Sequence, residues 1–562
     1  MSLFPRGLSL YHPQGHVARP SNPFGKDIAN AALFRALAKF GGFEEIAVLN
    51  RVGLTPEELA LAGDSPNPLR VISSPLYDLS SPVRHGTLLR GQPYLSDLSW
   101  LRRGHGFDTA FSLVGLIHTI APPFVRQDIA SCAFAATHPW DALVCTSPAV
   151  QFAMEQMFAA QADHFSSRLG STRLPRPQLP LIPLAVDTDR LARDGADSNS
   201  RASLRARLSI DEEDVLVLWV GRLSFYEKAF PQSMFQALRL ASLQSSRRFH
   251  FVLVGWFPGG DTELKMYEQA ANQLSPEINV HVMDGNDPRN VSESWSAADV
   301  FLSLVDNIQE TFGLTPIEAM AAGLPVVVSD WDGYRYTVRH GVDGFLIPTL
   351  GCAGGYPGEF LAELHSLELE TYQTYVGATA QHTAVHVNQA ASALVKLAEN
   401  PDLRLALGAA GQQRAQEMFS WSQVSRLYRD LFVDLADRRS VAHPDEAAAG
   451  ARLHPSRGEP FADFRHFSTH VLELDLVVRL SEGVTPADLE ERLKVQLNTL
   501  FSGLRGTNAE ASELLNRLEV SGRAGLPVQE LFAGFPPERH QFLQTTLVWL
   551  AKMDLVDWLP ID

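Results

Sequence analysis

The sequence predicts an α/β fold with two doubly wound domains that face a cleft, followed by a mostly helical C-terminal extension. Short apolar runs alternate with helical stretches from Val215 onward, which is typical of parallel strands covered by helices on both faces. The first two hundred residues show the same alternation less regularly, and the last hundred are mainly helical in pattern. A chain of 562 residues has room for two or three domains with separate cores.

Residues 1–205 form the first predicted Rossmann-like domain. Its strand-like runs are GLSLYH near the N-terminus, EEIAVLN, TAFSLVGLIH at 109–118 and DALVCTS at 141–147. The stretch KDIANAALFRALAKF has the pattern of a helix. A connector rich in proline and arginine follows, in which Asp187-Thr188-Asp189 is expected to be a turn and helix cap rather than a metal site.

Residues 206–438 form the second predicted Rossmann-like domain, with closing helices at its end. Its strand-like runs are VLVLWV at 215–220, FHFVLV at 249–254, INVHVM at 278–283, DVFLSLV at 299–305 and LPVVVSD at 324–330. Ligands of open α/β sheets bind at the carboxyl ends of the strands. A binding site is therefore expected where the two domains face each other.

The chain beyond 438 is predicted to be a linker and a separate module. Residues 439–460 have linker composition, and residues 461–562 contain three helical patterns. Thr485 is expected to cap the first of these helices, with Pro486 at its first position. The order of the elements is similar to that of a winged-helix module, and the sequence assigns it no role.

Charge and cysteine content argue against several classes of function. A net charge of −17 disfavours a nucleic-acid-binding protein, which needs a basic face. The three widely spaced cysteines, Cys132, Cys145 and Cys352, support neither a disulfide framework nor a zinc site. No apolar run approaches the roughly 18 to 20 residues of a membrane span, so a cytoplasmic protein is expected. Peripheral membrane contact, and a protein partner or self-association through 461–562, stay open.

The segment QETFGLTPIEAMAAGLPVVVSD at 309–330 contains two carboxylates, Glu310 and Glu318, with seven residues between them. Thr315 to Glu318 matches a Thr-x-x-Glu capping box, with Pro316 at the first helical position. Helix capping therefore explains Glu318 without a substrate. Glu310 lies before the helix and directly after a predicted strand, where capping does not explain it.

A site for a phosphate or diphosphate is expected at this turn. A helix N-terminus at the carboxyl end of a strand offers unpaired N–H groups and a partial positive charge, and Gly313 allows close approach to the backbone. The strand VLVLWV leads directly into GRLSFYEK, which presents Arg222 and Lys228. These could be ordinary surface charges, but their place at a strand end on the same side of the sheet favours a binding site.

These motifs resemble those of the retaining, family 4 type glycosyltransferases of glycosyltransferase-B fold. The matching pieces are WVGRLSFYEK at 219–228, LVGWF at 253–257, AADVFLSL at 297–304, the Glu-x7-Glu signature ETFGLTPIE, PVVVSDWDG, and VRHGVDGFLIPT at 338–349. Together the matches span roughly residues 142 to 421. The resemblance makes 1–205 the acceptor-side domain and 206–438 the nucleotide-sugar-binding domain.

The resemblance implies a role for each matched residue. Arg222 and Lys228 would bind the donor diphosphate, and Glu310 would hold hydroxyls of the sugar. Glu318 would accept the ribose hydroxyls, and His118, within GLIHTIAP, would face the donor sugar. The backbone at Phe312, Gly313 and Leu314, together with Thr315, would line the sugar and the phosphates.

Two features depart from the family pattern. The first loop, SNPFGKD, has the single glycine Gly25 where the family usually has a pair. Gly25 is still assigned to the donor site, and the departure leaves the acceptor side open. An insertion at 351–380 follows the last predicted strand, and the sequence assigns it no role.

The resulting hypothesis is a hexosyltransferase that moves a sugar from a nucleoside diphosphate sugar to a hydroxyl acceptor on a glycan, a lipid-linked molecule or a small molecule. Retention is implied by the resemblance alone, and neither a metal nor another cofactor is expected. The alternative is a non-catalytic nucleotide-sugar-binding or scaffold protein whose C-terminal module binds a partner, and an epimerase or phosphorylase on the same fold is a third hypothesis. The donor nucleotide, the sugar, the acceptor, the linkage and the oligomeric state stay open.

Overall fold

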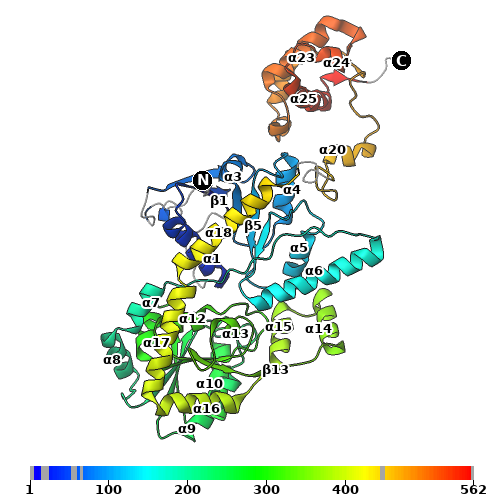
Figure 1. Ribbon diagram of the computed structural model, residues 1–562. Helices are drawn as coiled ribbons and strands as arrows, with labels where there is room; N and C mark the ends of the chain where they lie inside the picture. The colour runs from blue at the N-terminus through cyan, green and yellow to red at the C-terminus, as the bar shows by residue number, and fades with distance from the viewer. Residues whose placement is uncertain are drawn as a thin grey trace. The chain divides into compact units, whose positions relative to one another are not determined.

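The structure is a computed structural model that describes residues 6–13, 25–51, 53, 60–61, 63, 68–443 and 450–558. The chain falls into two compact units, Met1–His454 and Pro455–Asp562. The first unit contains two parallel six-stranded sheets with helices around them, and the second contains a small antiparallel sheet among helices (Figure 1).

The first sheet has the strand order β3-β2-β1-β4-β5-β6, and all its neighbouring strands are parallel. This is the Rossmann order, in which the chain changes direction across the sheet between β1 and β4. The strands are β1 (Gly7–Tyr11), β2 (Glu45–Asn50), β3 (Arg70–Pro75), β4 (Thr87–Arg90), β5 (Ser112–Leu116) and β6 (Ala142–Val144). The helices are α1 (Gly25–Phe40), α3 (Ser80–His85), α4 (Ser96–Gly104), α5 (Pro123–Ser131) and α6 (Pro148–Leu169).

The second sheet has the order β12-β11-β10-β7-β8-β9, which is the same order with the change of direction between β7 and β10. Its strands are β7 (Val215–Val220), β8 (Phe249–Gly255), β9 (Asn279–Asp284), β10 (Val300–Ser303), β11 (Val326–Ser329) and β12 (Gly344–Ile347). Its helices are α7 (Thr188–Gly195), α8 (Ser198–Arg207), α9 (Gln232–Ser242), α10 (Asp261–Leu274), α11 (Pro288–Ala297), α12 (Leu314–Ala321), α13 (Tyr334–Thr337), α16 (Val387–Glu399) and α17 (Pro401–Met418). The predicted α/β fold class is confirmed.

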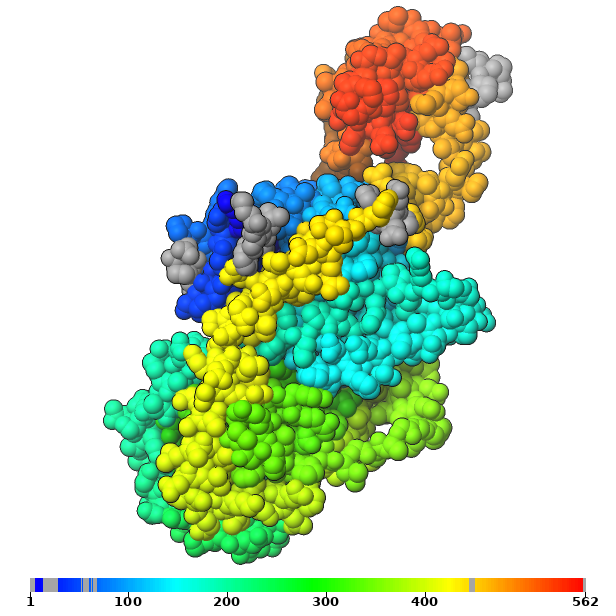
Figure 2. Space-filling view, viewed as in Figure 1, coloured from blue at the N-terminus to red at the C-terminus, as the bar shows by residue number. Residues whose placement is uncertain are grey.

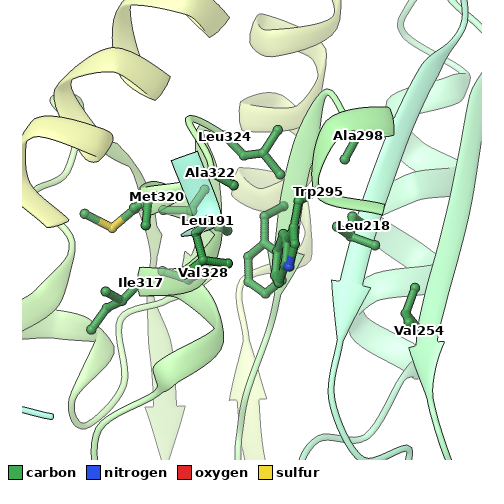
Figure 3. Packing of buried hydrophobic residues seen from close by; sticks show 14 of the residues in the cluster. Leu191, Leu218, Val254, Trp295, Ala298, Ile317, Met320, Ala322, Leu324 and Val328 are labelled. Atoms are coloured by element: carbon green, nitrogen blue, oxygen red, sulfur yellow. The ribbon is translucent and has the colours of Figure 1, made fainter. Parts of the chain in front are cut away.

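Both faces of the second sheet are buried, which explains why β7 is a continuous apolar run. Leu216 and Leu218 belong to one core cluster and Val217 and Trp219 to the other, as expected when successive side chains point to opposite faces. In the first cluster, Trp295 of α11 packs among residues from the sheet and from α7 and α12 (Figure 3). These cores fix the strand ends from which the candidate site is built.

The last helix of this unit, α18 (Trp421–Ser440), leaves the second sheet and packs on the first. Its residues Val424, Tyr428 and Phe432 are buried in the same cluster as Leu8 of β1. Figure 2 shows this yellow segment lying across the blue and cyan part of the chain. The closing helix therefore belongs to the core of the first sheet, although it follows the second sheet in the sequence.

The insertion at 351–380 forms a pair of helices that is closed at its base by two short strands. These elements are β13 (Thr349–Gly351), α14 (Tyr356–Ser366), α15 (Tyr372–Gln381) and β14 (Thr383–Val385). The strands β13 and β14 are antiparallel, with Thr349 opposite Val385 and Gly351 opposite Thr383. We call this α14–α15 pair the insertion hairpin.

The second unit is a three-stranded antiparallel sheet of order β16-β15-β17 with helices around a core of its own. Its elements are α20 (Pro460–Asp463), η1 (Arg465–Phe467), β15 (Val477–Leu480), α21 (Asp488–Leu493), α22 (Gln496–Thr499), η2 (Ser502–Leu504), α23 (Asn508–Ser521), η3 (Gly522–Ala524), β16 (Leu526–Pro527), α24 (Val528–Leu531), η4 (Pro537–Arg539), α25 (His540–Lys552) and β17 (Val556–Asp557). A mostly helical C-terminal module is confirmed, and its likeness to a winged helix stays a prediction.

The prediction that Thr485 caps a helix beginning at Pro486 is wrong. The helix α21 begins at Asp488, with Ala487 before it. The Asp488 carboxylate accepts hydrogen bonds from the Thr485 N–H and hydroxyl at 2.7 and 2.9 Å, and these hold 485–488 in a turn instead.

No helix in the described part of the chain is both long and apolar enough to cross a bilayer.

Candidate active site

The predicted donor-binding residues lie where the second sheet changes direction. Strands β7 and β10 are direct neighbours there, with Val217 opposite Val300. The loop after β7 carries Arg222 and Lys228, and the loop after β10 carries Glu310. Loops that follow neighbouring parallel strands at such a switch point are the usual ligand site of open α/β sheets.

Lys228 and Glu310 form an ion pair that joins these two loops. The Lys228 Nζ lies 3.1 Å from the Glu310 Oε2, and the side chains are 33% and 13% exposed. Burial acts to raise the pKa of Glu310, but the Lys228 ammonium and the N–H groups of Phe312 and Thr311 outweigh it and hold that pKa below its ordinary value. Glu310 is therefore a charged carboxylate held at the end of the sheet.

Arg222 is paired with a second carboxylate, Glu227, from the same loop. Their side chains are only 12% and 10% exposed. Glu227 directly precedes Lys228 in the sequence, but its side chain pairs with the other cation. Without a ligand, each of the two predicted diphosphate-binding cations thus faces a carboxylate.

The turn from Glu310 to Leu314 needs glycine at its fourth residue. Gly313 has a φ of 85°, and a Cβ there would lie 1.8 Å from Cε1 of Tyr334. Phe312, which was expected to line the ligand, is 3% exposed and packs edge-on against Phe419 with ring centroids 6.1 Å apart. The Phe312 backbone N–H, rather than its side chain, faces the site through the Glu310 carboxylate.

The predicted capping box at Thr315 is wrong. The helix α12 begins at Leu314 and its N-cap is Gly313, with no capping side chain. The left-handed conformation of Gly313 lets the chain enter the helix two residues before the sequence pattern suggests, so Thr315 and Pro316 lie inside the first turn. The half-buried Glu318 is not the capping carboxylate, and its implied role as a ribose ligand stays a prediction.

Thr315 faces a buried hydroxyl network behind the turn. It forms a side-chain hydrogen bond with Tyr334, whose hydroxyl lies 3.1 Å from the Ser303 Oγ at the end of β10. Burial raises the pKa of the Tyr334 phenol far above its usual range, and the charge of Glu310 adds to this effect. The network therefore fixes the turn between the Glu310 carboxylate and α12.

His118 lies two residues beyond β5, on the side of the first sheet that meets the Glu310 loop. Its Nε2 is 2.9 Å from the Asn30 Oδ1 and 3.0 Å from the Gly91 carbonyl oxygen. Because a carbonyl only accepts, Nε2 carries the proton in this arrangement. Gly25 is the first residue of α1, and the loop that precedes it lies outside the described residues.

Hydrogen bonds join the first sheet's loops to the second sheet's loops. The Thr311 hydroxyl donates to the His118 carbonyl at 2.7 Å, and the Thr146 hydroxyl donates to the Thr311 carbonyl at 3.4 Å. The Ser147 hydroxyl donates to the Asp332 Oδ1 at 3.1 Å. The structure thus brings His118, Glu310, Arg222 and Lys228 to one region, while their chemical roles stay predictions.

Asp332 is a candidate site residue that the sequence did not indicate. It follows β11 within the matched segment PVVVSDWDG, and its φ of 39° is one that L-residues rarely adopt. Burial raises the pKa of Asp332 to about 7, and the nearby Glu310 charge contributes to this. Sequence reasoning missed Asp332 because the sequence pattern reveals neither its strained backbone nor its proximity to Glu310.

Among the described residues, no cluster of three or more His, Cys, Asp or Glu side chains could hold a metal ion. All three cysteines are free, with Cys132 and Cys145 buried and Cys352 exposed. The Asp187 side chain caps α7 by accepting from the Arg190 N–H at 3.0 Å. The predicted turn and cap at Asp187-Thr188-Asp189 is confirmed.

Two Rossmann-like sheets with a switch-point site between them define the glycosyltransferase-B class of fold. The chain superposes on the crystal structure of a glycosyltransferase from Rickettsia africae ESF-5 with a TM-score of 0.50 and 13% sequence identity, covering 76% of this chain and 98% of that one. This likeness supports the fold. Residues 200–350 match the family model described as glycosyl transferases group 1, which agrees with the predicted resemblance over the segment that carries Arg222, Lys228, Glu310 and Glu318.

Curated relatives match part of the chain. A D-inositol 3-phosphate glycosyltransferase of Xylanimonas cellulosilytica is 30% identical over 168 residues, which are 30% of this chain and 38% of the relative. The lipopolysaccharide glucosyltransferase WaaG of Escherichia coli strain K12 is 34% identical over 149 residues, which are 26% and 37% of the two chains. A D-inositol 3-phosphate glycosyltransferase of Corynebacterium aurimucosum is 26% identical over 261 residues, 46% of this chain and 51% of the relative. The matches thus span between about a third and about half of these relatives.

Proposed function

We propose that this protein transfers a sugar from a nucleoside diphosphate sugar to a hydroxyl acceptor. The observation that carries the proposal is the Lys228–Glu310 ion pair at the switch point of a sheet whose segment matches a glycosyltransferase family. A cation that suits a diphosphate and a carboxylate that suits sugar hydroxyls lie 3.1 Å apart.

In the proposed reaction, the bond between the anomeric carbon and the diphosphate oxygen breaks, and its electron pair leaves with the nucleoside diphosphate. The acceptor hydroxyl oxygen forms the new bond to that carbon, and its proton passes to an oxygen of the departing phosphate. Negative charge grows on the diphosphate, and Arg222 and Lys228 are placed to stabilise it. We propose that these two cations act without a divalent metal ion and that the anomeric configuration is retained.

Donor binding would exchange the carboxylate partners of both cations. The diphosphate would take the place of Glu227 at Arg222 and of Glu310 at Lys228, which are the carboxylates paired with these cations in the structure. Glu310, freed from Lys228 but still held by two backbone N–H groups, would then accept hydrogen bonds from the sugar. Ligand binding thereby turns an internal ion pair into a substrate contact.

The names of the relatives specify no donor nucleotide. Their names describe glycosyl and glucosyl transfer to an inositol phosphate or a lipopolysaccharide. For this chain we propose a uridine or guanosine diphosphate sugar as donor and a hydroxyl compound as acceptor. A cytoplasmic location, peripheral membrane contact and a partner for residues 461–562 stay predictions.

A thermal-shift screen with UDP, GDP and their sugars tests this proposal. A ligand that binds only the folded protein stabilises it by about 2.7 kcal/mol at one hundred times its Kd, so a correct nucleotide will raise the unfolding temperature in a dose-dependent way. The nucleotide sugar that stabilises most is then assayed for release of free sugar or nucleoside diphosphate. Stabilisation without release would favour the non-catalytic binding protein, and stabilisation by neither nucleotide would contradict the proposal.

A further inference from the structure

The insertion hairpin, to which the sequence assigned no role, contacts the candidate active site. Its two helices are unequally buried, because α14 has no buried residue whereas α15 buries Val376, Gly377 and Ala380. Figure 1 shows the pair joined to the second domain beside β13. The hairpin is therefore anchored through α15.

The anchored face of α15 lies on the loop that carries the two diphosphate-binding cations. A Cβ at Gly377 would lie 3.0 Å from the Cβ of Tyr226, which is the residue before Glu227. The Gln373 amide nitrogen donates to the Glu227 Oε1 at 3.3 Å. Because Glu227 also pairs with Arg222, a single side chain, that of Glu227, connects α15 to a predicted phosphate ligand.

Tyr372, at the first position of α15, reaches two further loops of the site. Its hydroxyl donates to the Gln309 Oε1 at 3.0 Å, and it forms a second hydrogen bond with the Thr119 side chain. Gln309 precedes Glu310, and Thr119 follows His118. The Tyr372 hydroxyl thus links the Glu310 loop of the second sheet to the His118 loop of the first sheet. Glu310 and His118 are the two residues predicted to face the donor sugar.

The surroundings of Tyr372 resemble an active-site wall more than a surface contact. The side chain is half-buried, and burial raises its pKa well above the ordinary range, with the charge of Glu227 adding to the effect and that of Arg222 opposing it. The phenol is therefore neutral and can donate one hydrogen bond while it accepts another.

We propose that the insertion hairpin forms a wall of the sugar site and that Tyr372 is a positioning residue for transfer. By tying the Glu310 loop to the His118 loop, Tyr372 holds the sugar ligands in register and keeps water from the anomeric carbon. This inference rests on the proposed function. It deepens that function by assigning control of the bound sugar, rather than of the diphosphate, to a segment outside the glycosyltransferase motifs.

The test compares Tyr372→Phe with Tyr375→Phe, a control on the same helix. Tyr375 stacks on His365 within the hairpin, with ring centroids 5.0 Å apart, so its hydroxyl is not part of the proposed link. For each protein the Kd of the bare nucleoside diphosphate and of the stabilising nucleotide sugar are measured. Probes are UDP, GDP, UDP-glucose, UDP-N-acetylglucosamine and GDP-mannose.

We expect Tyr372→Phe to reduce the affinity gained from the sugar by about five- to a hundredfold, the effect of two lost hydrogen bonds of ordinary strength, and to leave the Kd of the diphosphate unchanged. Hydrolysis of the donor by water should be faster in Tyr372→Phe than in the Tyr375→Phe control, and in Tyr372→Phe it should rise relative to transfer. A purely structural role would instead lower the unfolding temperature and weaken both ligands together. That result, or equal behaviour of the two variants, would overturn the proposal.

A second variant removes the hairpin without opening the sheet. Because Gly351 and Thr383 are paired, residues 352–382 can be replaced by Asn-Gly, the preferred two-residue hairpin turn. We expect this variant to bind the diphosphate but to lose the preference for one sugar over another. Unchanged sugar preference would overturn the proposed wall, whereas a wild-type chain that binds no nucleotide would overturn the proposed function and this inference with it.

Discussion

Replacing Lys228 by methionine should separate the structural effect of the Lys228–Glu310 ion pair from its catalytic effect. Methionine keeps most of the length of the side chain and removes the charge. At 3.1 Å, two unit charges attract by about 5 kcal/mol if the effective dielectric constant is about 20. Desolvation and the partial exposure of Lys228 offset most of this attraction, so we expect a net loss of about 1–2 kcal/mol in the free energy of unfolding.

The same substitution should reduce turnover far more than stability. Loss of one preorganised group that stabilises transition-state charge typically lowers kcat by about 10²- to 10³-fold. In Lys228→Met, Glu310 also becomes a partly buried charge without its cation, which accounts for the expected loss of stability. The double variant Lys228→Met/Glu310→Gln removes that charge and should regain most of the stability while staying inactive.

Thermal unfolding and release of nucleoside diphosphate, measured on the wild type, Lys228→Met, Glu310→Gln and the double variant, test this reasoning. The single variant should unfold a few degrees below the wild type, and the double variant should unfold close to it. Recovery of turnover in the double variant would refute the assigned chemistry. A double variant that is less stable than either single variant would refute the ion-pair argument.

Three further outcomes are expected. Glu318→Gln should change the free energy of unfolding by no more than about 0.5 kcal/mol, because the N-cap of the helix is Gly313 and not Thr315. The same variant should weaken nucleotide binding by about three- to tenfold. A large loss of stability in thermal unfolding would show that Glu318 does cap the helix. Gly313→Ala should lower the free energy of unfolding by more than about 3 kcal/mol, because it combines a left-handed backbone with a collision against Tyr334. The control Gly341→Ala, which has a similar φ but open space around the new methyl group, should lower it by about 1 kcal/mol. Equal unfolding temperatures of the two variants would contradict the steric argument. The raised pKa of Asp332, about 7, means that between about pH 4 and pH 7 the folded state binds a proton that the unfolded state releases, so this group makes stability fall as the pH rises through that range. Asp332→Asn should remove that part of the decline. An unchanged profile of unfolding temperature against pH in this variant would contradict the argument.

Most of the strands that the sequence predicted are largely buried, and the edge strand β9, predicted from INVHVM, is the exception. VLVLWV and FHFVLV are continuous apolar runs because helices cover each side of the second sheet. Strand β3 was missed because five of its six residues are half-buried or exposed along an edge and it begins with Arg70. Strand β4 is only four residues long. An apolar run therefore signals a long, buried strand more clearly than an exposed or very short one.

The candidate site could be predicted only as far as its motifs are local. The residues Arg222, Lys228 and Glu310 follow strand ends, and the order of parallel strands brings them together. The capping box was misplaced because the sequence does not reveal the positive φ of Gly313. Tyr372 could not be found at all, since 62 residues separate it from Glu310 and its contact depends on how an insertion folds back.

The central claim is that Glu310 holds the sugar of a nucleoside diphosphate donor during transfer. The most direct measurement is release of nucleoside diphosphate by the wild type and by Glu310→Ala, with UDP- and GDP-sugars as donors and thermal unfolding as the check on folding. We predict release by the wild type and a loss of about 10²- to 10³-fold in a folded Glu310→Ala variant that still binds the bare diphosphate. Wild-type rates of release by that variant would contradict the account.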